Sequence, residues 1–68
     1  MERVNVSSSN ITSVGFEGNI LEIEFHGGEI YQYAGVSEAV YHELISAGSV
    51  GSYFHANIKD KYTTTQIR

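Results

Sequence analysis

The segment from Tyr53 to Tyr62, YFHANIKDKY, contains the densest group of side chains that could bind nucleic acid. Six of its residues are candidates for such contacts: Tyr53, His55, Asn57, Lys59, Lys61 and Tyr62. Lysine ammonium groups pair with phosphates, and a tyrosine ring stacks on an unpaired base, a contact that contributes about 1–3 kcal/mol per base. On a helix, His55, Lys59 and Tyr62 fall on one side, with the other polar candidates nearby.

The same segment also has a structural interpretation. Its aromatic and apolar residues would then belong to the core, and Lys59 and Lys61 would solvate an exposed helix end, where the helix dipole favours cations. Eight acidic residues against four basic ones give a net charge of −4, which opposes a broad attraction to phosphate. The sequence leaves both interpretations open.

The three histidines do not form the pattern of a metal site. His26, His42 and His55 fall on a turn and on two predicted helices, no two of them have HxH or HxxxH spacing, and the chain has no Cys. The Gly27-Gly28 pair lacks the strand-to-helix setting and the lysine of a phosphate-binding loop. We therefore expect exposed histidines, no bound metal and no cofactor.

Residues of the kinds used in hydrolysis are present but lack the surroundings that catalysis needs. Ser49, His55 and Asp60 are the elements of a triad, yet no nucleophile elbow surrounds the serine and no oxyanion hole is implied. Ser49 is better placed as a helix cap. Glu22 and Glu24 lie on one face of a strand, and we expect them to be exposed charges that favour solubility. We predict that the protein is not an enzyme.

Length and composition indicate one small domain, residues 1–68, without disulfide or metal cross-links. A chain of 68 residues buries only about 60% of the surface that its unfolded form exposes, so its stability must come from packing or from self-association. The longest apolar run is far shorter than the roughly 20 residues that span a bilayer, and the start MERVNVSSS lacks the features of a signal peptide. We expect a cytoplasmic protein of a bacterium or phage, with no membrane contact.

Three segments have the residue pattern of antiparallel strands. ITSVGF (11–16) is rich in β-branched and aromatic residues, ILEIEF (20–25) alternates apolar with acidic residues, and IYQY (30–33) follows a second turn. The first turn contains Gly18 and Asn19, and the second contains Gly27 and Gly28, all of which tolerate positive φ. This spacing predicts a β-meander.

The length of the second turn decides on which face Tyr31 and Tyr33 lie, because a shift of one residue moves both to the other side. A two-residue loop puts them on the outer face with the acidic residues and buries Gln32. A three-residue loop, with Gly28 in the left-handed conformation, turns them inward. We favour the second pairing because it buries no amide, although it exposes Ile30.

In the favoured pairing, Tyr31 lies opposite Ile23 and Tyr33 lies opposite Leu21. The two tyrosines are then mainly core residues under the helices. Their hydroxyls still need partners, and the rim between sheet and helix is where we expect them to find these.

Two helices should follow the strands. Ser37 is a good N-cap, and apolar residues at helical spacing up to Ile45 predict a helix that ends at Gly48. Ser49 can cap a second, shorter helix from about Val50 to Lys59. The ends, 1–8 and 63–68, are expected to fray unless the tail YTTTQIR forms an edge strand. The predicted fold class is α+β, a three-stranded antiparallel β-meander followed by two short helices packed on one face of the sheet.

The order of these motifs resembles the KTSC domain, a module of this length found at the C-terminus of some lysyl-tRNA synthetases and as a free-standing small protein. The resemblance is carried by SSSNITSVGF, LEIEF, the YxY of Tyr31 and Tyr33, GVSEAVYHELISAGSVGSYF and IKDKY, and it covers nearly the whole chain. Ser37 and Val50 stand where the family pattern often has Pro, and both still suit a helix start. The resemblance implies a domain of unestablished function for which RNA binding has been suggested.

Two functions follow from these observations. The first is a small non-enzymatic module that binds RNA, either tRNA or a single strand, through its second helix and nearby tyrosines. The second is a protein-interaction or self-association module that uses the sheet face or an edge strand, because the acidic balance, the exposed Ile30 and the thin core favour a protein partner. The sequence does not determine the oligomeric state.

Overall fold

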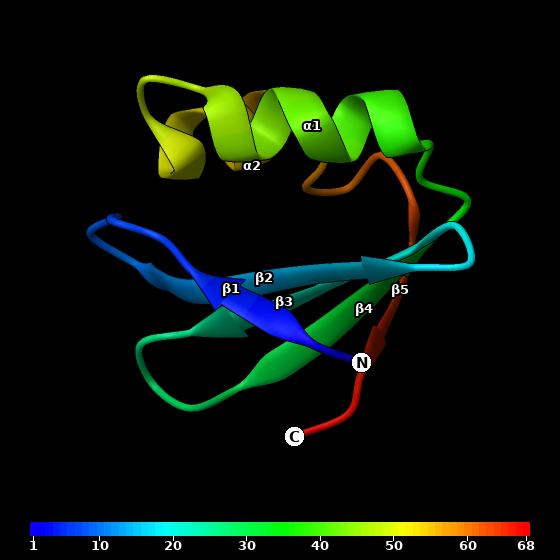
Figure 1. Ribbon diagram of the computed structural model, residues 1–68. Helices are drawn as coiled ribbons and strands as arrows, with labels where there is room; N and C mark the ends of the chain where they lie inside the picture. Colours follow the sequence, from blue (N-terminus) through cyan, green and yellow to red (C-terminus); the bar gives the residue numbers. More distant parts are fainter.

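Alternating apolar and polar residues in the first half of the chain produce an antiparallel sheet that two helices cover on one face (Figure 1). The computed structural model describes residues 1–68. The strands are β1 (Arg3–Asn5), β2 (Ile11–Glu17), β3 (Ile20–Phe25), β4 (Ile30–Ala34) and β5 (Thr63–Gln66), and the helices are α1 (Glu38–Ser46) and α2 (Val50–Asn57). The predicted α+β class and central meander are confirmed, but the sheet has five strands in the order β1-β2-β3-β4-β5 instead of three.

The turns set the register as the three-residue loop predicts. Gly18 and Asn19 join β2 to β3 with φ of 58° and 65°, and Gly28, in the next turn, has a φ of 95°. Tyr31 pairs with Ile23, and Tyr33 pairs with Leu21. Both tyrosines therefore belong to the face of the sheet that the helices cover.

The two ends of the chain form edge strands, so the expectation that residues 1–8 fray is wrong for Arg3–Asn5. β1 pairs with β2, and β5 pairs with β4, with Thr64 opposite Tyr33. Of the two predictions for the tail, a frayed end or an edge strand, the structure has the edge strand. Both ends of the chain lie on the side of the sheet away from the helices (Figure 1).

Ile30 is buried, contrary to the expectation that the favoured register exposes it. Its side chain is only 4% exposed. The chain after β5 runs alongside it: the Ile30 amide donates to the Arg68 carbonyl at 2.7 Å, and the Ile67 amide donates to the Ile30 carbonyl at 2.8 Å. The C-terminal segment therefore covers an apolar residue on the outer face of the sheet.

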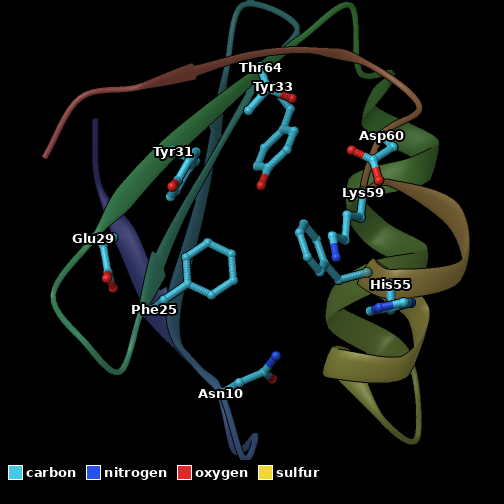
Figure 2. A pocket seen from close by; sticks show the side chains of 10 residues that line it. Asn10, Phe25, Glu29, Tyr31, Tyr33, His55, Lys59, Asp60 and Thr64 are labelled. Carbon is cyan, nitrogen blue, oxygen red and sulfur yellow. The ribbon is translucent and has the colours of Figure 1, made fainter.

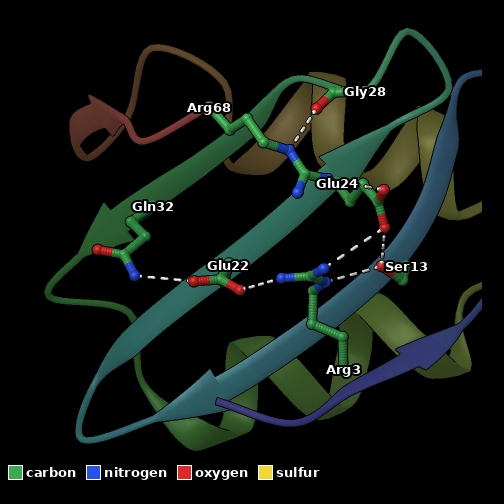
Figure 3. A network of polar contacts seen from close by, with 7 residues as sticks. All are labelled: Arg3, Ser13, Glu22, Glu24, Gly28, Gln32 and Arg68. Atoms are coloured by element: carbon green, nitrogen blue, oxygen red, sulfur yellow. Dashed lines mark hydrogen bonds and ion pairs between the residues drawn. The ribbon is translucent and has the colours of Figure 1, made fainter.

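The expectation that Glu22 and Glu24 are exposed charges is also wrong for Glu22, which is 5% exposed. Figure 3 shows the polar contacts around it. Arg3 forms an ion pair with Glu22, and Gln32 donates to the same carboxylate at 2.8 Å. Ser13 accepts from the Arg3 Nε at 3.0 Å and donates to Glu24 at 2.9 Å. A polar network thus crosses the outer face of the sheet and ties β1 to β2, β3 and β4.

Both helices begin at the predicted caps. The Ser37 and Ser49 side chains accept from the amides of Val40 and Ser52. The second helix ends at Asn57, before the predicted Lys59, because the Lys59 amide donates to the Phe54 carbonyl five residues back and so leaves the regular helical pattern. Neither helix is long enough or apolar enough to cross a membrane.

The core lies between the helices and the inner face of the sheet. Its ten buried residues come from β2, β3, β4, α1, α2 and the loops beside them: Ile11, Val14, Leu21, Ile23, Tyr33, Val36, Leu44, Val50, Phe54 and Ile58. Ile58 is fully buried although it lies just beyond α2. The chain then continues through Lys59 and Asp60 to β5.

Candidate functional site

An open pocket of about 420 Å³ lies between β4 and the C-terminal end of α2 (Figure 2). Its aromatic lining residues are Phe25, Tyr31, Tyr33 and Phe54. Its polar lining residues are Asn10, Glu29, His55, Lys59, Asp60 and Thr64. A volume of this order is typical of sites that hold small organic groups.

The aromatic rings support one another in a continuous chain. Phe54 meets Tyr33 and Phe25 edge-on, each with ring centroids 5.6 Å apart, and Phe25 meets Tyr31 at 5.7 Å in a nearly perpendicular arrangement. Tyr33 and Phe54 are buried, while Phe25 and Tyr31 are half-buried at the open side of the pocket. Because these rings already hold one another in place, they form a rigid apolar surface. A ligand that binds to it loses little affinity to the ordering of side chains.

The Tyr33 hydroxyl has an unusual environment. The residue is 4% exposed, and its hydroxyl points into the pocket (Figure 2). Among the five tyrosines, only Tyr53 donates its hydroxyl to another residue, so the Tyr33 hydroxyl has no partner within the chain. Burial, with the neighbouring Tyr31 and Asp60, raises the pKa of Tyr33 to about 12. The group is therefore a protonated hydroxyl at any physiological pH.

Charged groups of both signs surround the pocket. His55 comes from the last turn of α2, Lys59 and Asp60 come from the turn that follows it, and Glu29 lies in the turn before β4. None of these four belongs to an ion pair. With two carboxylates beside one lysine, the pocket as a whole does not attract anions strongly, and Lys59 is its only side chain with a permanent positive charge.

The structure separates the six residues that the sequence grouped together. His55 and Lys59 line the pocket, together with Tyr31 and Tyr33. Tyr53 instead donates its hydroxyl to Glu43 at 2.7 Å, which ties α2 to α1 and raises the pKa of Tyr53. Asn57, Lys61 and Tyr62 do not line the pocket: the Asn57 amide donates to the Tyr53 carbonyl at 3.2 Å, Lys61 is exposed, and Tyr62 packs against the core.

Tyr62 does not share a helix face with His55 and Lys59, because α2 has already ended. Asp60 takes the left-handed conformation, with a φ of 63°, and turns the chain away from the helix. Six lining residues were not among the candidates from the sequence: Asn10, Phe25, Glu29, Phe54, Asp60 and Thr64. Thr64 could be found only from the pairing of β5 with β4, for which the sequence offers no long-range signal.

The histidines are dispersed, and no three His, Cys, Asp or Glu side chains lie close enough to hold a metal ion. The His26 ring bonds to the Thr12 hydroxyl at 2.7 Å and to the Ser8 carbonyl at 2.8 Å, which joins the segment before β2 to the end of β3. His42 lies 3.5 Å from Glu38 on the surface of α1. Only His55 takes part in the pocket.

Comparison with known proteins places the chain among small domains of the same kind. The family model of the KTSC domain matches residues 7–62. The crystal structure of a KTSC domain protein from Yersinia pestis is 41% identical, covers 98% of this chain and 97% of its own, and superposes with a TM-score of 0.92. An uncharacterised protein of Stutzerimonas stutzeri is 38% identical in an alignment of length 64 that covers 91% of this chain and 90% of that protein. A lysine–tRNA ligase of Trichormus variabilis is 43% identical over 47 residues, 69% of this chain but only 8% of the ligase.

Proposed function

The chain belongs to the KTSC domain family, and we propose that it is a small non-enzymatic binding module that takes an unpaired RNA base into the pocket between β4 and α2. The observation that carries the proposal is the open aromatic pocket with Lys59 and His55 on its rim. We choose RNA as the ligand because the chain is similar to part of a lysine–tRNA ligase, an enzyme that acts on tRNA. We expect the module to act in the cytoplasm.

The pocket supports base binding through the distribution of its side chains. The half-buried rings of Phe25 and Tyr31 border its open side, where a flat base gains stacking and apolar contact. Lys59 and His55, on the facing rim, are placed to meet the phosphate that follows the base. Because these are the only basic groups of the pocket, affinity should be modest and the salt dependence shallow.

Replacing Lys59 by Glu should weaken the binding of single-stranded RNA about tenfold and leave the fold intact, because an exposed cation at the pocket rim becomes an anion. Lys61→Glu is the matched control, since it makes the same charge change two residues away on an exposed side chain that does not line the pocket. The measurement is an NMR titration of labelled protein with tRNA and with a mixed-sequence single strand, at about 50 mM and about 150 mM salt.

Chemical-shift changes should centre on Phe25, Tyr31, Phe54 and Lys59, and should weaken as salt rises. Equal effects of the two lysine variants would mean that RNA senses only the net charge and does not use the pocket. No shift with either RNA at the lower salt would exclude RNA as the ligand.

A second candidate function rests on β5. All four of its residues, Thr63–Gln66, are exposed, and the strand carries neither a charge nor a proline that would block pairing with another strand. A protein partner or a second copy of the chain could extend the sheet at this edge. Sedimentation velocity from about 10 μM to about 1 mM tests self-association; a constant monomer mass over that range would exclude it.

A further inference from the structure

Two polar groups at one end of the pocket have no partner within the chain. The Tyr33 hydroxyl belongs to a residue that is 4% exposed, and Asp60, which lies at the same end of the pocket, forms no ion pair (Figure 2). No fully buried side-chain nitrogen or oxygen of this chain lacks a partner, so the unpartnered Tyr33 hydroxyl is reached from the open pocket. The hydroxyl is therefore free to form a hydrogen bond with a group that enters the pocket.

The two groups have complementary hydrogen-bonding roles. The Asp60 carboxylate accepts hydrogen bonds, with two oxygens side by side. The Tyr33 hydroxyl, which lines the same end of the pocket, is a protonated donor. These two groups therefore offer two acceptors and one donor at this end of the pocket, and a ligand that bonds to both must present two N–H or O–H donors and one acceptor.

Among the four RNA bases, one has this order on its Watson–Crick edge. Guanine presents the O6 acceptor, the N1–H donor and the N2–H donor in a row, whereas uracil places its single N3–H between two carbonyl oxygens. Adenine and cytosine each place an amino donor next to a ring-nitrogen acceptor, so a carboxylate can take only one hydrogen bond from either. Acceptor facing acceptor is repulsive, and each such mismatch lowers affinity.

We propose that the pocket recognises guanine, with the Asp60 carboxylate accepting from N1–H and N2–H and the Tyr33 hydroxyl donating to O6. The inference rests on the proposed function, because it names the base that the RNA-binding pocket selects. Phe25 and Tyr31 would contact the base itself, and Lys59 would remain at the rim for the phosphate.

The test measures the affinity of the whole chain for four short single-stranded RNAs that are identical except for one central base. The strand with guanine should bind about tenfold more tightly than the strands with adenine, cytosine or uracil, the size expected for hydrogen bonds to a charged acceptor. A fifth strand with inosine, which lacks the N2 amino group, should lose most of that advantage. Equal affinities for all five strands would overturn the inference and leave RNA binding itself intact, whereas no binding of any strand would overturn both.

Two conservative variants assign the preference to the proposed groups. Asp60→Asn keeps a side chain that suits the left-handed backbone and replaces one acceptor oxygen by a donor, so the preference for guanine should disappear. Tyr33→Phe keeps the ring and removes only the hydroxyl, so guanine affinity should fall while stability stays unchanged or rises. A loss of stability in Tyr33→Phe would show that the hydroxyl serves the fold, and it would contradict the inference.

Titration with the four free nucleoside monophosphates distinguishes the two sources of guanine. If RNA is the source, the guanine strand should bind more tightly than guanosine monophosphate, because the strand adds phosphate and stacking contacts. Equal affinity for the strand and the mononucleotide would support guanine recognition but identify a free nucleotide as the ligand. That result would contradict the RNA function and not the base preference.

Discussion

Leu44→Ala is expected to leave a substantial fraction of the protein unfolded at 25 °C. Leu44 is the only residue of α1 that is fully buried, with an exposure of 0%. Truncation of a buried leucine costs about 2–5 kcal/mol, because the apolar transfer energy is lost and a cavity remains. A chain of 68 residues has a total stability of only about 3–10 kcal/mol. The loss is therefore comparable with the whole stability.

The neighbouring Ile45 provides the matched control. It lies on the same helix and is 36% exposed, so Ile45→Ala should cost less than about 1 kcal/mol. Urea unfolding followed by circular dichroism measures both values. If the two variants lost the same stability, α1 could not be held on the sheet through Leu44, and its packing in this structure would be wrong.

The central part of the fold was predictable because its signals are local. The alternation in ILEIEF gives one strand two different faces, and Gly18, Asn19 and Gly28 occupy the positions of positive φ that the turns require. Those turns, with the requirement that no amide be buried, were enough to place Tyr31 and Tyr33 on the inner face. The caps Ser37 and Ser49 fixed where the helices begin.

The edge strands and the pocket were not predictable, because each depends on contacts between distant parts of the chain. β1 has three residues and β5 has four polar ones, too few for an alternating pattern. The burial of Ile30 depends on the backbone near Arg68, 38 positions later in the sequence. The pocket likewise needs residues from before β2, from α2 and from β5, so only half of its polar rim, His55, Lys59 and Asp60, fell within the segment that the sequence singled out.

Gly15 also has a structural role that depends on a residue distant in the sequence. Arg3 lies directly above it, and a Cβ at this position would come within 2.9 Å of the Arg3 Cγ and 2.7 Å of the Glu2 carbonyl oxygen. The absence of a side chain in β2 therefore lets β1 place its arginine across the sheet, where it reaches Glu22 (Figure 3). A glycine inside a predicted strand gave no sign of this contact, since its partner is twelve positions away in the sequence.

Arg3→Ala should destabilise the protein by about 2–3 kcal/mol at neutral pH, because it leaves the Glu22 carboxylate, 5% exposed, without its cation. Burial alone would raise the pKa of Glu22. The hydrogen bonds from Gln32 and Arg3, with the charge of Arg3, outweigh burial and hold that pKa below its ordinary value of 4.5. Since the folded pKa lies below the unfolded one, the stability that Glu22 contributes is present above about pH 4.5 and is lost as the pH falls through the folded pKa.

The effect of Arg3→Ala should therefore shrink with acid. At about pH 3 the Glu22 carboxyl of the variant is protonated and no longer needs a cation, so the difference from the wild-type protein should fall below about 1 kcal/mol. Urea unfolding of both proteins at about pH 7 and about pH 3 measures it. Arg68→Ala is the matched control: its side chain is 64% exposed and lies 3.4 Å from Glu24, so its loss should cost less than about 1 kcal/mol at either pH.

The double variant Arg3→Ala/Glu22→Gln separates charge from packing. A neutral amide at position 22 has no need of a cation and can still bond to Gln32, so the second substitution should recover most of the stability that the first removes. If the second substitution recovered no stability, the loss in Arg3→Ala would come from the arginine stem that covers Gly15. The stability lost in Arg3→Ala should then be the same at both pH values. The two results thus decide whether β1 is held to the sheet by its buried ion pair or by the apolar part of one side chain.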